Sequence, residues 1–331
     1  MRNDEPTGDR MSKNNDHFTR NQASKIPEPP HPQRRRERLP WQTAKAEEED
    51  PGARARLEAI LSSASYRLAE DDVDFLDRND VRGVRLLLEY LKPELLLQEH
   101  GIRDTVVVFG GTRIDEPAAA QRRVDGLKRK LAGTPHDKAL ARQLAVAERI
   151  LAKSHYYGTA REFGRLVSSA GGHTIVMTGG GPGIMEAANR GAFDVGAKSV
   201  GLNIDLPHEQ YPNPYITTEL CFRFRYFALR KLHLMQRTRA LVAFPGGYGT
   251  LDELFEVLTL IQTRKIKPIP VVLVGETYWR RVVDIDFMVD EGVIDAEDRE
   301  LFWYAETADE IWNGILHWHK QGGEPLPSGK A

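Results

Sequence analysis

The predicted fold is organised around residues 245–253, Pro245-Gly246-Gly247-Tyr248-Gly249-Thr250-Leu251-Asp252-Glu253. Just before it, residues 240–244 (A-L-V-A-F) have the length and apolar character of a buried parallel strand. Just after it, apolar residues recur at helical spacing, which predicts a one-sided helix to about Thr263. A glycine turn between a strand and a helix start surrounds an anion with free N–H groups and the positive end of the helix dipole. The stretch therefore predicts an anion site, and its expected guest is a phosphate.

Two further glycine turns lie upstream. Residues 173–177 read as a strand that ends in Thr178-Gly179-Gly180-Gly181-Pro182-Gly183, with a helix from Ile184. Residues 105–109 (T-V-V-V-F) read as a strand that ends in Gly110-Gly111-Thr112-Arg113, where a hydroxyl and a guanidinium are available to a phosphate. Strand ends of this kind meet at the carboxyl edge of an open α/β sheet, where ligands bind. The three turns thus predict one cleft.

Standard nucleotide fingerprints fit these turns poorly. A P-loop needs a lysine after its last glycine, and none is present. In the dinucleotide pattern G-x-G-x-x-G read from Gly179, Ile184 occupies the place of the third glycine. Asp205 lies at roughly the right distance for a ribose contact, so a dinucleotide site is only weakly supported.

The alternation of strands and helices predicts the fold class, an α/β doubly wound parallel sheet of Rossmann type. Two helical additions are expected beside it, a preamble over residues 53–100 and an inserted helical hairpin over residues 117–154 for packing or oligomerisation. The remaining expected strands cover residues 199–204, 269–274 and 302–304, and the remaining helices cover residues 158–170, 223–237 and 308–319.

Residues 1–52 are expected to form a disordered tail before a single domain over residues 53–331. They carry almost no large aliphatic side chains but hold proline, basic and acidic clusters, so they cannot bury enough surface to offset their ordering entropy. The alternative is a docking arm anchored by Trp41.

Composition excludes several classes of protein. A formal net charge of −2 over 331 residues argues against a general nucleic-acid binder. Cys221 is the only cysteine, so neither a disulfide framework nor a thiolate metal cluster is expected, and a reducing, cytoplasmic setting is favoured. No apolar run has the length of a membrane span. His317 and His319 allow a two-histidine metal site, but without a third ligand a surface pair is favoured.

Two glutamates on helices near the glycine turns are candidates for chemistry. On a helical wheel Glu253 lies opposite the apolar stripe, so its carboxylate is expected to face solvent or the cleft. The alternative is structural, because Thr250-Leu251-Asp252-Glu253 also fits a capping box. Glu186 either binds a ligand hydroxyl or is an ordinary first-turn acid favoured by the helix dipole.

The helix expected before the central strand carries two cations. Lys231 falls inside its apolar stripe and Arg230 at the stripe's edge. A charged lysine in a packed stripe must snorkel or pair, so the choice is between snorkelling and an anionic ligand in the cleft. Glu209, in the loop after residues 199–204, is also placed to reach the cleft.

Together these residues resemble the Lonely Guy family, phosphoribohydrolases that release cytokinin bases from riboside monophosphates and that are also labelled lysine decarboxylase-like. The family's P-G-G-x-G-T-x-x-E is complete at residues 245–253. Its glycine-rich motif is matched at residues 179–185 with one residue fewer, and its Arg-Lys pair is matched by Arg230-Lys231. The likeness extends from about Val106 to Tyr278 and is similar in phrasing to the longer bacterial branch.

The resemblance implies a set of site residues. Arg230 and Glu253 would be the catalytic pair. The substrate contacts that it implies, together with those expected from the glycine turns, are Thr112, Gly180, Gly181, Met185, Glu186, Glu209, Lys231, Gly246, Gly247, Tyr248, Gly249, Thr250 and Thr259.

The expected function is hydrolysis of the N-glycosidic bond of a nucleoside 5′-monophosphate, without metal or redox cofactor, by a homodimer or higher homo-oligomer. The alternative is a nucleotide-binding or carrier protein without turnover. Lysine decarboxylation is disfavoured, since the sequence offers no context for a pyridoxal-phosphate lysine. The sequence leaves open whether the base is adenine or an N6-prenylated adenine.

Overall fold

The computed structural model describes residues 29–171, 174–207 and 211–326. The chain divides into two compact units, residues 1–75 and residues 76–331. The predicted tail belongs to the first unit, and the predicted glycine turns all belong to the second. Among the helices of the described residues, none has both the length and the apolar character required to cross a membrane.

The described part of the first unit consists of short helical segments with exposed apolar side chains. Its longest helix, α2 (Ala53–Leu61), begins at the first residue of the predicted preamble and ends before Ser62 and Ser63. The Ser63 hydroxyl accepts a hydrogen bond from the Ser65 amide and caps a separate 3-10 turn, a local bond that competes with continuation of the helix. The other segments are η1 (Pro40–Gln42), η2 (Ala64–Tyr66), η3 (Ala69–Asp71) and α3 (Val73–Leu76), which ends at the boundary.

The second unit contains a seven-stranded sheet in the order β4-β3-β2-β1-β5-β6-β7. Every neighbouring pair is parallel, so the α/β doubly wound prediction is confirmed. The strands are β1 (Asp104–Phe109), β2 (Thr174–Thr178), β3 (Ser199–Ile204), β4 (Cys221–Phe224), β5 (Thr238–Ala243), β6 (Val271–Val274) and β7 (Trp303–Ala305).

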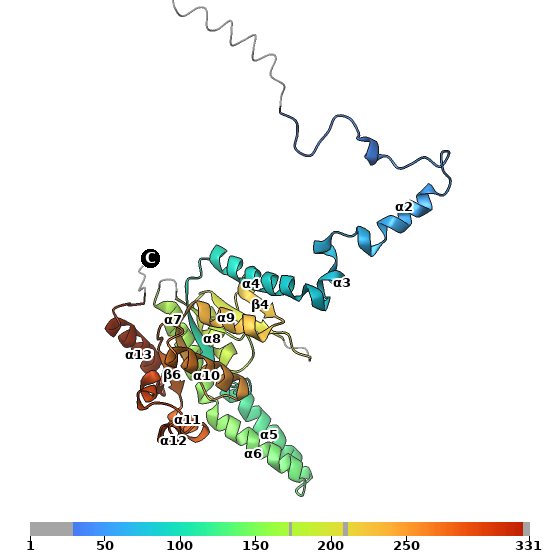
Figure 1. Cartoon of the computed structure of the whole chain (residues 1–331). Helices are drawn as coiled ribbons and strands as arrows, with labels where there is room; N and C mark the ends of the chain where they lie inside the picture. Colours follow the sequence, from blue (N-terminus) through green and yellow to red (C-terminus); the bar gives the residue numbers. More distant parts are fainter. Residues whose placement is uncertain (1–28, 172–173, 208–210, 327–331) are drawn as a thin grey trace, which may run out of the picture. The chain divides into compact units, whose positions relative to one another are not determined.

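Helices cover both faces of this sheet (Figure 1). One core layer includes side chains of α7 (His155–Ser169), α8 (Ile184–Asp194) and α13 (Ala308–Gln321). The other includes side chains of α4 (Arg82–Glu99), α9 (Phe227–Gln236), α10 (Tyr248–Gln262) and α11 (Glu276–Val282). Because both faces are covered, the middle of the central strands is apolar on both sides, as at Val106, Val107 and Val108, which are fully buried.

The predicted inserted hairpin is confirmed as α5 (Pro117–Gly133) and α6 (Lys138–Lys153), which lie side by side and extend away from the sheet (Figure 1). Pro117 occupies the first turn of α5, and the Asp137 carboxylate caps α6 by accepting hydrogen bonds from the amides of Ala139 and Leu140. α6 ends at Lys153, and the backbone of Ser154 remains helical, so that α7 follows almost directly.

The expected helix over residues 223–237 is wrong at its start. Residues 221–224 form the edge strand β4 instead, and α9 begins only at Phe227. The reason is a two-residue alternation: Phe222 and Phe224 are buried, whereas Arg223 between them is exposed. A four-residue alternation beside a helical stripe is easily absorbed into the helix when only the sequence is considered.

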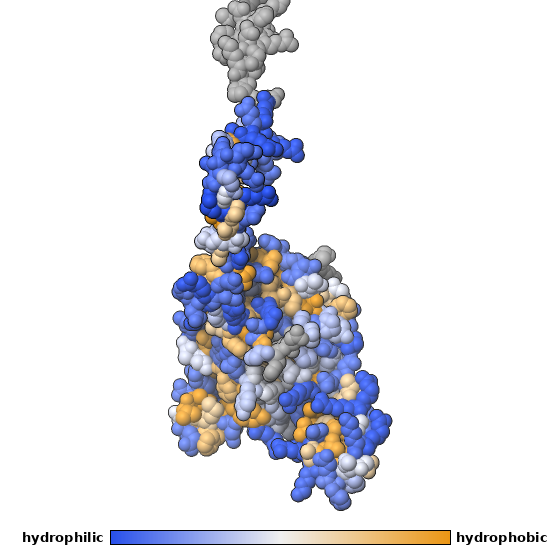
Figure 2. Space-filling view, turned by 90° about the vertical axis from the view of Figure 1, so that its right-hand side faces the viewer, coloured by the Kyte–Doolittle hydropathy of each residue, from blue (hydrophilic) through white to orange (hydrophobic). Residues whose placement is uncertain are grey.

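Figure 2 shows the surface as separate apolar patches among hydrophilic residues. On α4, the exposed apolar side chains Val84, Leu87, Leu88, Leu91 and Leu95 share one helical face. Phe227 and Leu232 are exposed on α9. The smaller elements of the second unit are η4 (Asn79–Val81), η5 (Thr218–Leu220), α12 (Ile285–Asp290) and η6 (Ala296–Leu301).

Candidate active site

The three predicted glycine turns meet at the carboxyl edge of the sheet. The strand order reverses between β1 and β5, and here the Gly111 amide donates to the Pro245 carbonyl at 2.9 Å. The Ile184 amide, at the start of α8, donates to the Gly111 carbonyl at 3.3 Å. Gly183 has φ +73°, and a Cβ there would lie 2.4 Å from the Gly111 oxygen. The turns after β1, β2 and β5 therefore form one continuous backbone surface at the switch point.

Arg230 connects the elements around this surface. Its Nε donates to the Leu202 carbonyl at 2.7 Å, and its Nη1 lies 3.4 Å from Glu253 Oε1. A Cβ on Gly179 would lie 2.4 Å from Arg230 Nη2, so only glycine lets the guanidinium approach this backbone so closely. The arginine thus joins β3, the turn after β2 and the helix after β5.

Glu253 is buried, with 3% of its surface exposed, rather than facing solvent. Burial raises the pKa of its carboxyl to about 7, although the neighbouring Arg230 lowers it. Burial likewise lowers the pKa of the Arg230 guanidinium, against the effect of Glu253. The pair places a proton-accepting carboxylate and a cation 3.4 Å apart in a site with little water.

The capping-box alternative for Glu253 is wrong. α10 begins at Tyr248 with Gly247 as its N-cap, whereas a capping box would need the N-cap at Thr250 and the helix start at Leu251, three residues later. Thr250 is already inside the first turn and is 5% exposed. Glu253 therefore lies within the helix, and its side chain is free to contact Arg230.

The loop at the start of α10 has the features of an anion site. The amides of Tyr248 and Gly249 have no backbone hydrogen-bond partner among the described residues, whereas those of Thr250 and Leu251 donate to the Gly247 carbonyl. A Cβ on Gly247 or Gly249 would meet open space. A Cβ on Gly246 would instead lie 2.1 Å from Thr250 Oγ1, so this glycine serves the packing of the loop.

The buried residue Asn213 holds the turn after β2 in place by hydrogen bonds. The Asn213 amide donates to the Gly180 carbonyl at 2.9 Å, and its Nδ2 donates to the Gly181 carbonyl at 3.1 Å. Met185 is buried, and its Sδ would lie 3.0 Å from a Cβ on Gly179. This turn is therefore fixed in shape beside Arg230.

Glu186 forms a hydrogen bond with Tyr157 rather than with Arg230. Its Oε1 accepts a hydrogen bond from the Tyr157 hydroxyl at 2.8 Å, and Arg190 lies 3.4 Å from the same hydroxyl. Arg190 also forms a close ion pair with Glu116. Burial raises the pKa of Tyr157 well above its ordinary value, so the phenol remains a donor.

Three predicted substrate contacts line a hollow whose lining includes neither Arg230 nor Glu253. Lys231, Tyr248 and Thr259 line a shallow hollow of about 620 Å³ along the exposed side of α10. Burial would lower the pKa of Lys231, but hydrogen bonds to Asp252 and Glu256 raise it above its ordinary value. Lys231 Nζ lies 2.9 Å from Asp252 and 3.0 Å from Glu256, so its charge is already compensated there.

The other predicted residues have varied positions. Thr112 is exposed beside Gly183, whereas Asp205 forms a close ion pair with Arg223. Glu209 lies outside the described residues. His319 is buried and its Nε2 lies 2.9 Å from the Arg239 carbonyl.

Sequence reasoning missed Tyr278, whose hydroxyl donates a close hydrogen bond to the Gly246 carbonyl. It also missed Asn213 and Tyr157, which support the turn after β2. The only available signal was the position of Tyr278 shortly after a strand, at the same edge as the glycine turns.

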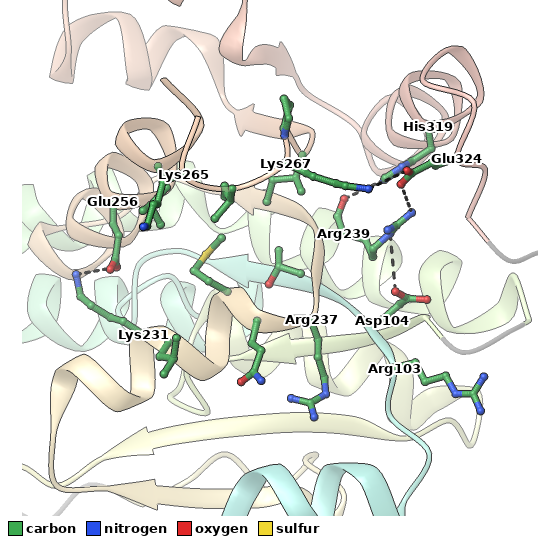
Figure 3. A pocket seen from close by; sticks show the side chains of 18 of the residues that line it. Arg103, Asp104, Lys231, Arg237, Arg239, Glu256, Lys265, Lys267, His319 and Glu324 are labelled. Carbon is green, nitrogen blue, oxygen red and sulfur yellow. Dashed lines mark hydrogen bonds and ion pairs between the residues drawn. The ribbon is translucent and has the colours of Figure 1, made fainter. Parts of the chain in front are cut away.

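A cavity of about 1190 Å³, larger than the hollow along α10, is elsewhere (Figure 3). It includes Asp104 and Thr238, the first residues of β1 and β5, and so reaches the amino edge of the sheet. Of the predicted site residues it contains Lys231 alone. Its other cations are partly paired, as Lys267 with Glu324 at 3.2 Å. The buried pair at the carboxyl edge, with its perturbed carboxyl pKa, is the stronger candidate for catalysis.

Comparisons with known proteins show which proteins this chain resembles. A family model described as "Possible lysine decarboxylase" matches residues 185–315, which include Arg230 and Glu253. The chain is 32% identical over 163 residues to the cytokinin riboside 5′-monophosphate phosphoribohydrolase LOG3 of Arabidopsis thaliana, covering 48% of this chain and 74% of that protein. It is 31% identical over 163 residues to the cytokinin riboside 5′-monophosphate phosphoribohydrolase LOG of Oryza sativa subsp. japonica, covering 48% of this chain and 65% of that protein.

Two solved structures are more distantly similar. The X-ray structure of TM1055 has 19% identity and a TM-score of 0.40, covering 65% of this chain and 99% of that one. A molybdenum cofactor binding protein from Rippkaea orientalis has 18% identity and a TM-score of 0.36, covering 49% of this chain and 87% of that one.

Proposed function

Because this chain belongs to the LOG family, whose similar members are named phosphoribohydrolases, we propose that it hydrolyses the N-glycosidic bond of a nucleoside 5′-monophosphate. The products are the free base and ribose 5-phosphate. AMP and N6-modified AMP, such as a cytokinin riboside monophosphate, are the proposed substrates.

One observation carries the proposal. The buried pair of Arg230 and Glu253 lies beside a glycine loop with free amides at the start of α10. A phosphate on this loop anchors the nucleotide, and the helix dipole adds to the attraction. Glu253 lies in the same helix, five residues after Tyr248, so an anchored ribose is within reach of its carboxylate.

Glu253 and Arg230 divide the chemistry between them. The C1′–N bond breaks with its electron pair leaving on the base, while positive charge develops on the ribose. The ionised Glu253 carboxylate stabilises this charge and accepts a proton from the water that attacks C1′. The departing base takes a proton from solvent or from a donor held near Arg230. The phosphate contacts contribute orientation away from the reacting bond.

The test compares phosphorylated and unphosphorylated substrates. Pure protein is incubated with AMP, N6-isopentenyl-AMP and the two matching nucleosides, and released base is separated by chromatography. We expect cleavage of the monophosphates and at least a hundredfold lower kcat/KM for the nucleosides. Comparable values for both would refute the phosphate anchor.

The carrier alternative makes a different prediction in the same experiment. A protein without turnover would bind AMP, measured by calorimetry, and return it uncleaved. Binding without any released base from the whole panel would therefore replace hydrolysis with the carrier function. The relative rates for the two monophosphates decide which base is preferred.

A further inference from the structure

The hairpin of α5 and α6 differs sharply in charge from the rest of the chain. Residues 117–154 contain nine Lys and Arg but three Asp and Glu, which gives a net charge of +6. Since the whole chain has a net charge of −2, the remaining residues sum to −8. The hairpin is therefore strongly basic although the net charge of the whole chain is slightly negative.

The cations of α6 occupy one face. Lys138, Arg142, Arg149 and Lys153 are spaced i, i+4, i+11 and i+15, so they share the side of α6 away from the buried Ala147. No acidic residue lies within this stripe. On α5, Arg122 and Arg129 lie opposite the buried Ala120 and Val124, and a second pair seven residues apart, Arg123 and Lys130, lies on an adjoining exposed flank.

These charges have almost no role within the chain. The only ion pair inside the hairpin, in the described part of the chain, joins Lys128 to Glu148 at 3.4 Å between two exposed side chains. The other hairpin cations form no ion pair among the described residues, and all of them except the half-buried Lys153 are exposed. Concentrated unpaired charge costs self-repulsion, so an external anion would relieve it.

The surface favours a phosphate backbone over a protein partner. Protein interfaces have apolar and aromatic centres in which lysine is depleted. The hairpin has no aromatic residue, and Val146, at 42% exposed, is its only exposed large apolar side chain. The stripe on α6 covers fifteen residue steps, from Lys138 to Lys153, and spans about 22 Å, roughly the length of six or seven phosphates along one nucleic-acid strand. Membrane binding is also disfavoured, because an interfacial helix buries an apolar face and the hairpin exposes only one large apolar side chain.

We propose that the basic hairpin, residues 117–153, is a docking surface for the phosphate backbone of a nucleic acid. The surface extends from the carboxyl edge of the sheet, because α5 follows the β1 turn and Glu116 at its base contacts Arg190. The proposal rests on the charges of the hairpin alone and stands whether or not the cleft hydrolyses nucleotides.

The experiment is fluorescence anisotropy of the full chain with a labelled 20-nucleotide RNA and, separately, a labelled 20-base-pair DNA, between 50 and 200 mM KCl. Four contacts from the α6 stripe predict a slope of about −3.6 in log K against log salt for duplex DNA and about −2.8 for a single strand. The two probes distinguish the form of nucleic acid that binds.

A charge-reversed variant, K138E/R142E/R149E, should raise Kd at least tenfold and reduce the slope by about 3. The matched control K92E/K265E/R281E changes three exposed cations outside the hairpin that form no ion pair among the described residues. Its Kd should change less, apart from the small general effect of net charge. Circular dichroism melting checks that both variants fold, and the milder R142Q/R149Q serves if the triple variant does not.

Three results would overturn the proposal. The first is no binding at 50 mM KCl. The second is an equal loss of affinity in the hairpin variant and its control, which would mean general charge attraction. The third is displacement by a polyglutamate peptide, or by phosphatidylglycerol vesicles, at the same charge concentration as unlabelled nucleic acid, which would indicate an acidic protein or a membrane surface.

Discussion

Glu253 and Arg230 are opposite charges that share a buried site, and each alters the acidity of the other. Burial disfavours the charged form of both side chains, raising the carboxyl pKa and lowering the guanidinium pKa. Their mutual attraction opposes these shifts. The balance leaves a carboxyl whose pKa of about 7 suits a base that works near neutral pH.

Glu253→Gln tests the proposed base. Glutamine retains the size and a hydrogen-bond acceptor toward Arg230 but removes the negative charge and the proton-accepting oxygen. We expect turnover of AMP-type substrates to fall by a factor of roughly a hundred or more. Calorimetry should still detect nucleotide binding, and circular dichroism should show a folded protein. Near-normal turnover in the folded variant would remove Glu253 from the mechanism.

As pH rises, kcat/KM should increase, whereas the contribution of Glu253 to the stability of the folded state should decrease. The ionised Glu253 is the active form, so kcat/KM should rise with pH and level off above about 7. The folded-state pKa lies above the ordinary value of 4.5, so between these values the folded state holds a proton that the unfolded state releases. This group therefore makes stability fall as pH rises through that window. Glu253→Gln should lose this contribution to both profiles; a wild-type rate profile flat from pH 5 to 8 would contradict the assignment.

At the scale of elements, the loop before α10 contains glycines with different roles. Gly249→Ala places a methyl group in open space above the free amides, where the phosphate is proposed to lie. We expect an unchanged melting temperature and a KM for AMP raised by about tenfold, equivalent to about 1.4 kcal/mol. Gly246→Ala is the comparison, because its methyl group collides with Thr250 and should lower the melting temperature. Unchanged KM in the folded Gly249→Ala variant would argue against phosphate binding here.

Elements with a continuous apolar run or a glycine turn were predictable from the sequence. Residues 105–109 and 240–244 are found close to their expected bounds, as β1 and β5. β4 could not be predicted, because its four residues, which include one exposed arginine, resemble the beginning of the following helix. Likewise α2 ends at Leu61, where local hydroxyl groups compete for the backbone.

The environment of Glu253 could not be predicted from the helix alone. A helical wheel ranks faces by apolar content, and the face of Glu253 is polar by that measure. Part of its surroundings comes from a segment distant in sequence, since Arg230, which itself lies against the Gly179 turn, contacts it. The same limit applies to Tyr278 and Asn213, whose contacts depend on which strand ends are neighbours in the sheet.

For the whole molecule, the second unit should fold and act without the first. Its sheet and both core layers lie entirely within residues 76–331. Deleting residues 1–75 should therefore shift the melting temperature by only a few degrees and preserve kcat/KM for AMP. The shorter deletion of residues 1–52 tests the predicted tail in the same way. A large loss of stability or activity in either would show that the removed residues complete the domain.

The exposed apolar faces of α4 and α9 favour association between two or more copies of this chain. α4 presents a stripe of five exposed apolar side chains, and α9 exposes Phe227 and Leu232. We expect light scattering at micromolar concentration to give at least the mass of a dimer. Leu88→Glu and Leu232→Glu, each on one of these faces, should show which one is used, because a buried charge would dissociate the assembly. A monomer mass for the unmodified protein would refute the prediction.

The position of β5 beside β1 has a consequence for the order of events during synthesis. β1 begins at Asp104 and β5 at Thr238, so one side of β1 has no native partner until about 130 further residues have been made. At about 5–20 residues per second, that interval is on the order of ten seconds. Throughout it, the valines of β1 border an open edge on the nascent chain, a period of exposure to aggregation that ends only when β5 leaves the ribosome.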